Sequence, residues 1–268
     1  MTPRAPVAST AGAAVEGVCV AAVICAAGSS TRMEGQEKKE YRVLPSSKTG
    51  LTVLGAAVRS FAVLSEIKLI IVAVPNDPVT GEKAARKAIP AELLAGKKYP
   101  PVYFVKGGKN RRASVYNALA VLHGKFPVKA GFKNYVLIHD GARPWVSPRF
   151  IRRIISEVKN HPAVVPVVPL TETPKETTLP MGVSFGKDAV PVYVKTHLKR
   201  SCVGISQTPQ AFAYPQILNL HKMAAEHERL MGVEFTDDAE IWGTFHGSVA
   251  VIPGEAKNRK ITFPGDIR

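Results

Sequence analysis

Small residues that lead into a cation, directly after an apolar run, are the first feature of this chain that could do chemistry. Residues 25–33 have the sequence Cys-Ala-Ala-Gly-Ser-Ser-Thr-Arg-Met and follow the apolar run 18–24. A buried strand ends at the carboxyl edge of a parallel sheet, where residues with little side chain let backbone N–H groups approach an anion. Arg32 would add a positive charge there. Taken alone, however, the stretch favours an ordinary tight turn with a surface arginine.

A second stretch of the same kind has the sequence Gly-Gly-Lys-Asn-Arg-Arg-Ala-Ser-Val at residues 107–115. It lies between a predicted strand and a predicted helix. Paired glycines permit positive φ, a helix start offers unpaired N–H groups, and Ser114 can donate and accept toward a base or sugar. A glycine-assisted loop with Ser114 near a helix cap explains the stretch about as well.

A third candidate site is an aspartate at the end of a predicted strand, in Ile-His-Asp-Gly-Ala-Arg-Pro at residues 138–144. Mg²⁺ takes one or two carboxylates and fills its remaining positions with water and substrate phosphates, so Asp140 is a candidate magnesium ligand. Arg143 could bind a phosphate or pair with Asp140. We assign His139 to structure, because it has no partner of its own type nearby in the sequence.

The elements that must position these residues alternate between apolar runs and helical patterns. Strands are expected at 68–75, 101–105, 134–139, 163–170, 190–195 and 247–252, and helices at 51–64, 77–94, 111–124, 147–159, 215–228 and 236–244. The predicted fold class is therefore α/β, with a mostly parallel twisted sheet covered on both faces. Residues 171–202, rich in proline and glycine, break the alternation and predict a projecting β-arm.

The expected domain organisation is a flexible leader at residues 1–17 and one domain at 18–268 that includes the arm. The leader is rich in Ala, Thr and Pro and shows no periodicity. A signal peptide is the alternative for the first apolar run, but the run ends in the Gly-Ser-Ser-Thr-Arg turn, so a buried first strand is favoured. No apolar stretch approaches 18 residues, so no transmembrane helix is expected.

The overall charge predicts an anionic ligand. Lys and Arg number 36 against 21 Asp and Glu, a formal net charge of +15. Nucleic acid is one such ligand, but the cations are dispersed and lack the aromatic interleaving of single-strand binders, and a small phosphorylated substrate fits equally well. Three cysteines without zinc-ligand spacing exclude a disulfide framework and favour a reducing, cytoplasmic location.

Further short motifs complete a pattern along the chain. The segments are Ala-Ala-Gly-x-x-x-Arg-Met at 26–33, Lys-Glu-Tyr at 39–41, Gly-Gly-x-x-Arg-x-x-Ser-Val at 107–115, His-Asp-Gly-Ala-Arg-Pro at 139–144, Gln-Thr-Pro-Gln at 207–210, Thr-Asp-Asp-Ala at 236–239 and Asn-x-Lys-Ile-Thr at 258–262. In this order, they make the chain resemble the 2-C-methyl-D-erythritol 4-phosphate cytidylyltransferases from residue 20 to residue 267. The first motif is shared by many nucleotidyltransferases, whereas the combination is narrow.

The resemblance implies a Rossmann-like fold of the nucleotide-diphospho-sugar transferase type. It also implies an enzyme that transfers CMP from CTP to a polyol phosphate with the help of Mg²⁺, and that acts as a homodimer. Its catalytic residues would be Arg32, Lys39 and Lys260. Its cytidine-binding residues would be Ala26, Ala27, Gly28, Gly108, Lys109 and Ser114. The positions that match its methylerythritol phosphate site are Asp140, Arg143, Thr173, Arg200, Thr208 and Thr236. Thr173 and Arg200 would come from the arm and reach into a neighbouring subunit.

The sequence departs from the family pattern at the lysine motif, at residues 42–51 and 77–100, where the chain is longer than usual, and at its last residues. Lys38-Lys39-Glu40 replaces the usual Pro-Lys-Gln, so the choice of Lys39 rests on its spacing to Tyr41. Members commonly continue into a final helix beyond the last residue here. Either the C-terminus is naturally short, or the chain is part of a longer protein, and the second case suggests the hypothesis that the gene continues into a second pathway domain.

Other functions remain as alternatives. A ribitol 5-phosphate cytidylyltransferase would share the nucleotide half of the site. From a different class of protein, the net positive charge leaves a nucleic-acid-binding protein as an alternative. A Rossmann oxidoreductase ranks last, because no G-x-G-x-x-G follows the first strand.

Overall fold

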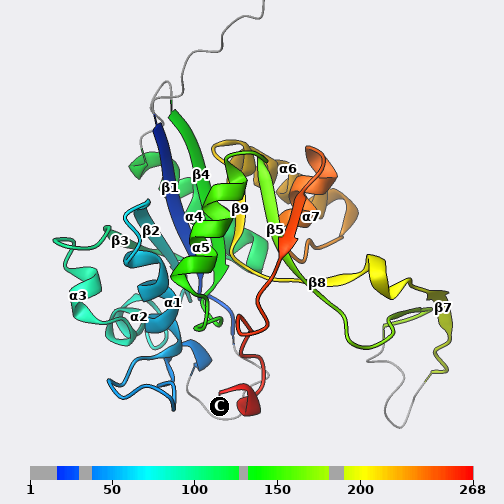
Figure 1. Ribbon diagram of the computed structural model, residues 1–268, viewed down its shortest axis with the longest axis horizontal. Coiled ribbons are helices and arrows are strands. Elements are labelled where there is room, and N and C mark those ends of the chain that lie inside the picture. The colour runs from blue at the N-terminus through cyan, green and yellow to red at the C-terminus, as the bar shows by residue number, and fades with distance from the viewer. Residues whose placement is uncertain (1–16, 30–37, 127–131, 181–189, 268) are drawn as a thin grey trace, which may run out of the picture.

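A computed structural model describes residues 17–29, 38–126, 132–180 and 190–267 of the chain. Within these ranges an eight-stranded sheet has the order β10-β5-β9-β4-β1-β2-β3, with β8 paired to β5 (Figure 1). Its strands are β1 (Gly17–Cys25), β2 (Ile67–Val74), β3 (Val102–Lys106), β4 (Phe132–Asp140), β5 (Ala163–Pro169), β8 (Gly204–Ser206), β9 (Gln210–Ala213) and β10 (Ala250–Pro253). The helices are α1 (Val53–Ala62), α2 (Glu82–Ala88), α3 (Ala91–Leu94), α4 (Arg111–Lys125), α5 (Pro148–Val158), α6 (Gln216–Met231) and α7 (Asp238–Phe245).

The centre of the sheet is parallel, as predicted. β1 pairs in parallel with both β2 and β4, and β9 runs antiparallel between β4 and β5. The register of β1 and β4 sets Cys25 opposite Asp140. Because both strands end there, the small-residue turn after β1 and the strand-end aspartate lie at the same edge of the sheet.

The sheet separates two apolar layers. On one face, Ile24 of β1 packs with residues of α1 and α5 that include Phe61 and Phe150. On the other face, Val23 packs with residues of α4, α6 and α7 that include Leu119 and Trp242. Successive side chains of a strand point to opposite faces, so a continuous apolar run is what a strand covered on both faces requires. The predicted α/β class is confirmed.

Two predicted elements differ from the observed ones for local reasons. The helix predicted over 77–94 is split into α2 and α3 by Pro90, which cannot donate a helical N–H group. The strand predicted over 190–195 is instead β7 (Val194–His197), which begins after Pro191. Strand β9 was not predicted, because its four residues carry no β-branched side chain and begin with a polar one.

The stretch predicted to leave the sheet does form a separate pair of strands. β6 (Lys175–Thr177) pairs antiparallel with β7 in a two-stranded sheet that projects from the body of the molecule (Figure 1). The predicted leader lies outside the described residues except for Gly17, which begins β1. Across the described part of the chain, no helix combines the length and apolar character needed to cross a membrane.

Candidate active site

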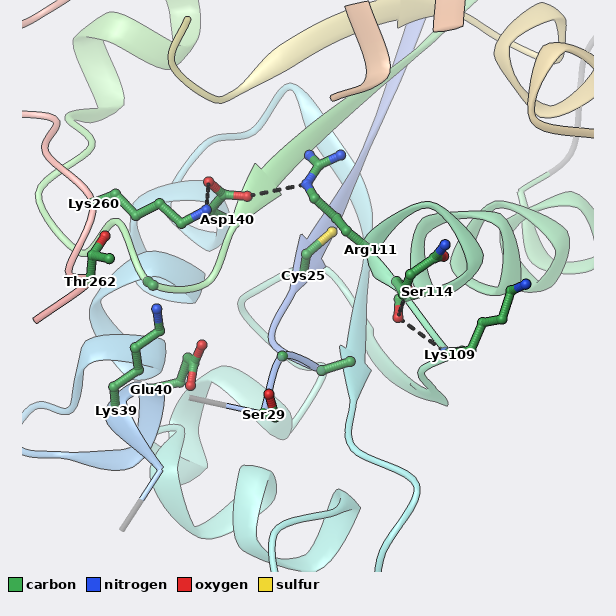
Figure 2. A pocket seen from close by; sticks show the side chains of 15 residues that line it. Cys25, Ser29, Lys39, Glu40, Lys109, Arg111, Ser114, Asp140, Lys260 and Thr262 are labelled. Atoms are coloured by element: carbon green, nitrogen blue, oxygen red, sulfur yellow. Dashed lines mark hydrogen bonds and ion pairs between the residues drawn. The ribbon is translucent and has the colours of Figure 1, made fainter. Parts of the chain in front are cut away.

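A cavity of about 470 Å³ opens at the carboxyl ends of β1 and β4, beside the start of α4. Its size is within the range usual for small-molecule sites. It is lined by Cys25, Ala27, Gly28, Ser29, Lys39, Glu40, Gly108, Lys109, Asn110, Arg111, Ser114, Asp140, Ala142, Lys260 and Thr262 (Figure 2). The lining therefore unites the two glycine turns, the strand-end aspartate and two lysines from distant parts of the sequence.

The turn after β1 forms one wall of the cavity. Ala26 is fully buried, and its N–H donates to the carbonyl of Ala73 at 2.8 Å, which continues the pairing of β1 with β2. Ala27 and Gly28 then line the cavity. A Cβ on Gly28 would meet no atom within 4 Å, so this residue leaves open space beside its backbone. Arg32 lies outside the described residues.

The glycines of the second turn are needed for close packing and not for positive φ, which corrects the expectation from the sequence. A Cβ on Gly107 would lie 2.3 Å from the Cβ of Ala27, and a Cβ on Gly108 would lie 2.4 Å from the Cβ of Ala113. Neither glycine has positive φ. Gly107 therefore lets the two turns come into direct contact, and any larger residue would separate them.

Ser114 uses its hydroxyl group to shape the second turn. Its Oγ accepts from the N–H of Gly108 at 3.0 Å and donates to the carbonyl of Asn110 at 2.9 Å. Asn110 itself caps α4, accepting from the N–H of Ala113 at 2.9 Å. Ser114 thus lies beside the cap of α4 and stabilises a glycine-containing loop, which is the structural role given above as the alternative. One lone pair of the hydroxyl remains for a donor in the cavity.

Asp140 lies at the centre of a cluster of cations. Its carboxylate is 3.1 Å from Nζ of Lys260, 3.3 Å from Nε of Arg143 and 3.6 Å from Nε of Arg111. Burial alone would raise the pKa of Asp140, but the three cations together hold it well below its usual range. Asp140 therefore stays ionised at neutral pH, and its charge is already compensated by the protein.

His139, at the preceding position in β4, has a structural role, as predicted. The N–H of Asp140 donates to Oγ1 of Thr208 at 3.0 Å, and this hydroxyl lies 3.0 Å from Nδ1 of His139. Nε2 of His139 lies 3.1 Å from the carbonyl of Arg143, which can only accept. A neutral imidazole protonated at Nε2 satisfies every one of these contacts, since Thr208 then donates to Nδ1. Burial lowers the pKa of His139 to about 4.

This burial predicts a loss of stability in acid that a glutamine at position 139 should reduce. The pKa is about 4 in the folded protein and about 6.5 in an unfolded chain, so between these values the unfolded state binds the proton first. The free energy of unfolding should therefore fall by about 2–3 kcal/mol through His139 between pH 7 and pH 4.5. Urea unfolding at both pH values should show the difference between the wild type and His139→Gln shrinking by this amount. An unchanged difference would contradict a buried neutral His139.

The segment that carries Lys260 is held against the Gln-Thr-Pro-Gln motif. The side chain of Gln207 donates to the carbonyl of Glu255 at 2.9 Å, and that of Asn258 donates to the carbonyl of Thr208 at 2.7 Å. The N–H of Ile261 then donates to the carbonyl of Ala142 at 2.9 Å. These bonds fix the backbone on both sides of Lys260. The Gln-Thr-Pro-Gln motif therefore helps to place the lysine of the Asn-x-Lys-Ile-Thr motif in the cavity.

The geometry distinguishes the two neighbouring lysines of the Lys-Lys-Glu-Tyr segment. Lys39 lines the cavity, and its Nζ donates to the carbonyl of Ile261 at 2.9 Å. Lys38 is absent from the lining. Its Nζ lies 3.0 Å from the carboxylate of Glu40 and donates to the carbonyl of Gly28. The side chain that faces a ligand is thus that of Lys39, in agreement with the spacing argument.

Five residues predicted to hold the acceptor lie outside the lining of this cavity. Arg143 and Thr208 are buried beside it, and Arg143 also donates to the carbonyl of Asn258 at 2.8 Å. Thr236 is exposed, and its N–H and Oγ1 both donate to the carboxylate of Glu240, each at 2.8 Å. The N-cap of α7 is the next residue, Asp237, whose side chain accepts from the N–H of Glu240.

The remaining two predicted acceptor residues belong to the arm. Thr173 is exposed, and Arg200 is exposed with its guanidinium donating to the carbonyl of Thr171 at 3.0 Å. Neither residue lines the cavity of its own chain. Figure 1 shows the arm directed away from the body of the molecule.

Five polar or charged residues of the lining are not among the predicted site residues, namely Ser29, Glu40, Asn110, Arg111 and Thr262. Each lies inside a motif that was recognised. The spacing of residues within a motif does not indicate which side chains face the cavity, because that depends on how the turns of the motifs fold.

A mostly parallel sheet with two glycine-rich turns and a basic cavity at its carboxyl edge defines a nucleotidyltransferase-like protein. The solved structure of 4-diphosphocytidyl-2C-methyl-D-erythritol synthase from Anaerococcus prevotii has a TM-score of 0.67 and 25% identity to this chain, covering 93% of it and 95% of the other. The 2-C-methyl-D-erythritol 4-phosphate cytidylyltransferase of Francisella tularensis also has a TM-score of 0.67, with 26% identity over 93% and 96% of the two chains.

The sequence itself matches the 2-C-methyl-D-erythritol 4-phosphate cytidylyltransferase family over residues 20–268. A relative of that name from Pelotomaculum thermopropionicum is 32% identical over 248 residues, which cover 92% of this chain and 91% of the relative. The chain therefore belongs to this family. The match confirms the predicted activity, CTP-dependent cytidylyl transfer to 2-C-methyl-D-erythritol 4-phosphate in isoprenoid precursor biosynthesis.

Some relatives are longer than this chain. A protein named bifunctional enzyme IspD/IspF in Nitrobacter hamburgensis is 33% identical over 246 residues, which make up 92% of this chain and 53% of that relative. The chain thus spans about half the length of the bifunctional relatives. Their names include a second activity, which is said of those proteins alone.

Proposed function

We propose that this cavity joins the phosphate of 2-C-methyl-D-erythritol 4-phosphate to the α-phosphorus of CTP, with Lys39, Lys260 and Arg32 as catalytic cations. The observation that supports this most strongly is the convergence of Lys39 and Lys260 on one cavity together with Asp140. Two anionic reactants repel each other, so a site that brings them together needs fixed positive charges. The backbone at Ala26, Ala27, Gly28 and Gly108, with Lys109 and Ser114, would hold the cytidine.

The proposed chemistry needs no general base. A phosphate monoester is largely dianionic at neutral pH, so its oxygen attacks the α-phosphorus directly. The bond from the α-phosphorus to the bridging oxygen breaks, and pyrophosphate leaves with the electron pair. The one thiol in the lining, that of Cys25, is not available as a base, because burial raises its pKa to about 12 and keeps it neutral. Lys39 and Lys260 would stabilise charge that builds up on the oxygens around phosphorus.

Mg²⁺ would enter this site with the nucleotide. The described residues contain no group of three or more His, Cys, Asp or Glu side chains placed to hold a metal ion. Asp140 already contacts three cations, which disfavours it as a direct ligand. A magnesium ion bound mainly by phosphates and water fits such a site. When bound, it would neutralise part of the triphosphate charge.

We further propose that the enzyme is a homodimer of the cytoplasm. The arm holds Arg200 and Thr173 away from the cavity of its own chain, and its strand β7 exposes Val194 to solvent. A second copy that receives the arm would cover this surface and would supply both side chains to the acceptor site. The three free cysteines support a reducing compartment.

The test of this function is the release of pyrophosphate by the purified protein with CTP, Mg²⁺ and 2-C-methyl-D-erythritol 4-phosphate. We expect turnover with CTP and much slower turnover with UTP. We also expect a higher kcat/KM for methylerythritol phosphate than for ribitol 5-phosphate. A reversed preference would assign the chain to the alternative acceptor. Salt-sensitive binding of nucleic acid without pyrophosphate release would overturn the proposal.

A further inference from the structure

Arg111 is a cavity residue with no role in the proposed transfer so far, and it joins two carboxylates. It is the first residue of α4 and lines the cavity. Its Nε lies 3.6 Å from the carboxylate of Asp140, and its Nη2 lies 2.7 Å from that of Asp238 (Figure 2 shows the side of Arg111 that faces Asp140). A planar guanidinium can contact two carboxylates at once, which an ammonium group cannot do with the same geometry.

Asp238 is a fixed anchor for this guanidinium. It is fully buried at the start of α7. The side chain of Gln210, also fully buried, accepts from the N–H groups of Asp238 and Ala239 at 3.2 and 3.0 Å. The second oxygen of Asp238 lies 3.2 Å from Nε2 of His221 in α6. The position of Arg111 is therefore set by groups that lie outside the cavity and are held by β9, α6 and α7.

The ion pair joins a fully buried carboxylate to a partly buried guanidinium, and its charges are costly to hold there unless they are well paired. Burial opposes the charge of Arg111, while Asp238 and Asp140 raise its pKa well above the usual value. Removing one partner of such a pair leaves the other uncompensated. Both charges are therefore present in the folded protein, and Arg111 has one fixed place beside Asp140.

We propose that Arg111 is a positioning residue of the transfer reaction, which links Asp140 in the cavity to the buried anchor Asp238. This inference rests on the proposed function and on the acceptor contact that the family resemblance implies for Asp140. Arg111 approaches Asp140 from α4, and Lys260 and Arg143 approach it from the other motifs. Without Arg111, the carboxylate of Asp140 would shift toward Lys260 and Arg143, and the acceptor would lose its alignment with the α-phosphorus.

The next residue along α4 provides a matched control. Arg112 is buried, whereas Arg111 is partly exposed, and the Nε of Arg112 forms an equally short ion pair of 2.7 Å with Glu228 of α6. Arg112 does not line the cavity. Arg111→Lys and Arg112→Lys therefore remove the same guanidinium from the same turn of the same helix, and only the first changes the surroundings of Asp140.

The experiment compares steady-state kinetics of the wild type, Arg111→Lys, Asp238→Asn and Arg112→Lys, with CTP binding measured separately by calorimetry. For Arg111→Lys we expect kcat/KM for the acceptor to fall about 10- to 100-fold, the scale of a small misplacement of a reactant. The dissociation constant for CTP should stay within about twofold of wild type. Arg112→Lys should keep wild-type kinetic constants, even if its melting temperature falls.

Asp238→Asn keeps the size of the anchor and removes its charge, and it tests the inference if Arg111→Lys does not fold. It should show the same acceptor defect, and the double variant should be no worse than either single variant, because both act through one contact. Wild-type acceptor kinetics in a folded Arg111→Lys or Asp238→Asn protein would overturn the inference. So would an equal kinetic defect in Arg112→Lys. Neither result would affect the proposed function, which the wild-type assay tests.

Discussion

Replacing Lys260 by methionine should lower kcat about 10²- to 10³-fold, which corresponds to about 2.7–4 kcal/mol of transition-state stabilisation. The reason is the position of its ammonium group, which lines the cavity 3.1 Å from Asp140. No other described lysine of the same loop has this placement. The loss should appear in the rate of pyrophosphate release at saturating CTP and acceptor, because the charge acts on the transition state and not mainly on binding.

Lys257→Met is the matched control for this prediction. Lys257 belongs to the same loop and is exposed, and it does not line the cavity. It should keep wild-type rates. If Lys260→Met turned over as fast as Lys257→Met, the ammonium group would have no catalytic role, and the proposed set of cations would be wrong.

A complementation experiment should show that two chains build one acceptor site. Lys39→Met and Arg200→Met should each be nearly inactive as homodimers. A heterodimer that contains one chain of each kind has one site with both wild-type side chains, if the arm of one subunit serves the cavity of the other. Co-expressed with different tags and purified through both, the heterodimer should recover about half of the wild-type rate, since one of its two sites is intact.

The control pair is Lys39→Met with Lys260→Met. Both side chains line the cavity of one chain, so every site in this heterodimer carries a defect and no activity should return. Failure of the Lys39→Met and Arg200→Met pair to recover activity would show that Arg200 does not act across subunits. Recovery in both pairs would show that the assay reports something else.

Much of the fold follows from the sequence because strands β1, β2 and β4 are long and apolar. Such runs predict strands that are buried on both faces. Strand β9 could not be predicted from its four residues, because it owes its place to pairing with β4 and β5. The split between α2 and α3 could have been predicted, since Pro90 marks it.

The site was less predictable than the fold, because ion pairs and packing between distant segments decide which groups face the cavity. The sequence placed Lys39, Asp140 and Lys260 at a common site, and all three line the cavity. It gave the wrong reason for the paired glycines, whose backbones are needed for close approach. It also left Arg143 open between two partners, and the structure shows it paired with Asp140. The ion pair of Arg111 with Asp238 joins residues from separate motifs, and no pattern within either motif indicates it.

The new phosphorus–oxygen bond that the proposed transfer forms can be observed by ³¹P nuclear magnetic resonance. Purified protein would be mixed with CTP, Mg²⁺ and 2-C-methyl-D-erythritol 4-phosphate. We predict that the acceptor phosphate resonance is replaced by two coupled diphosphate resonances, while pyrophosphate appears in an equal amount. The proposed transfer would be contradicted if CMP and pyrophosphate formed while the acceptor phosphate resonance stayed unchanged, or if none of the resonances changed.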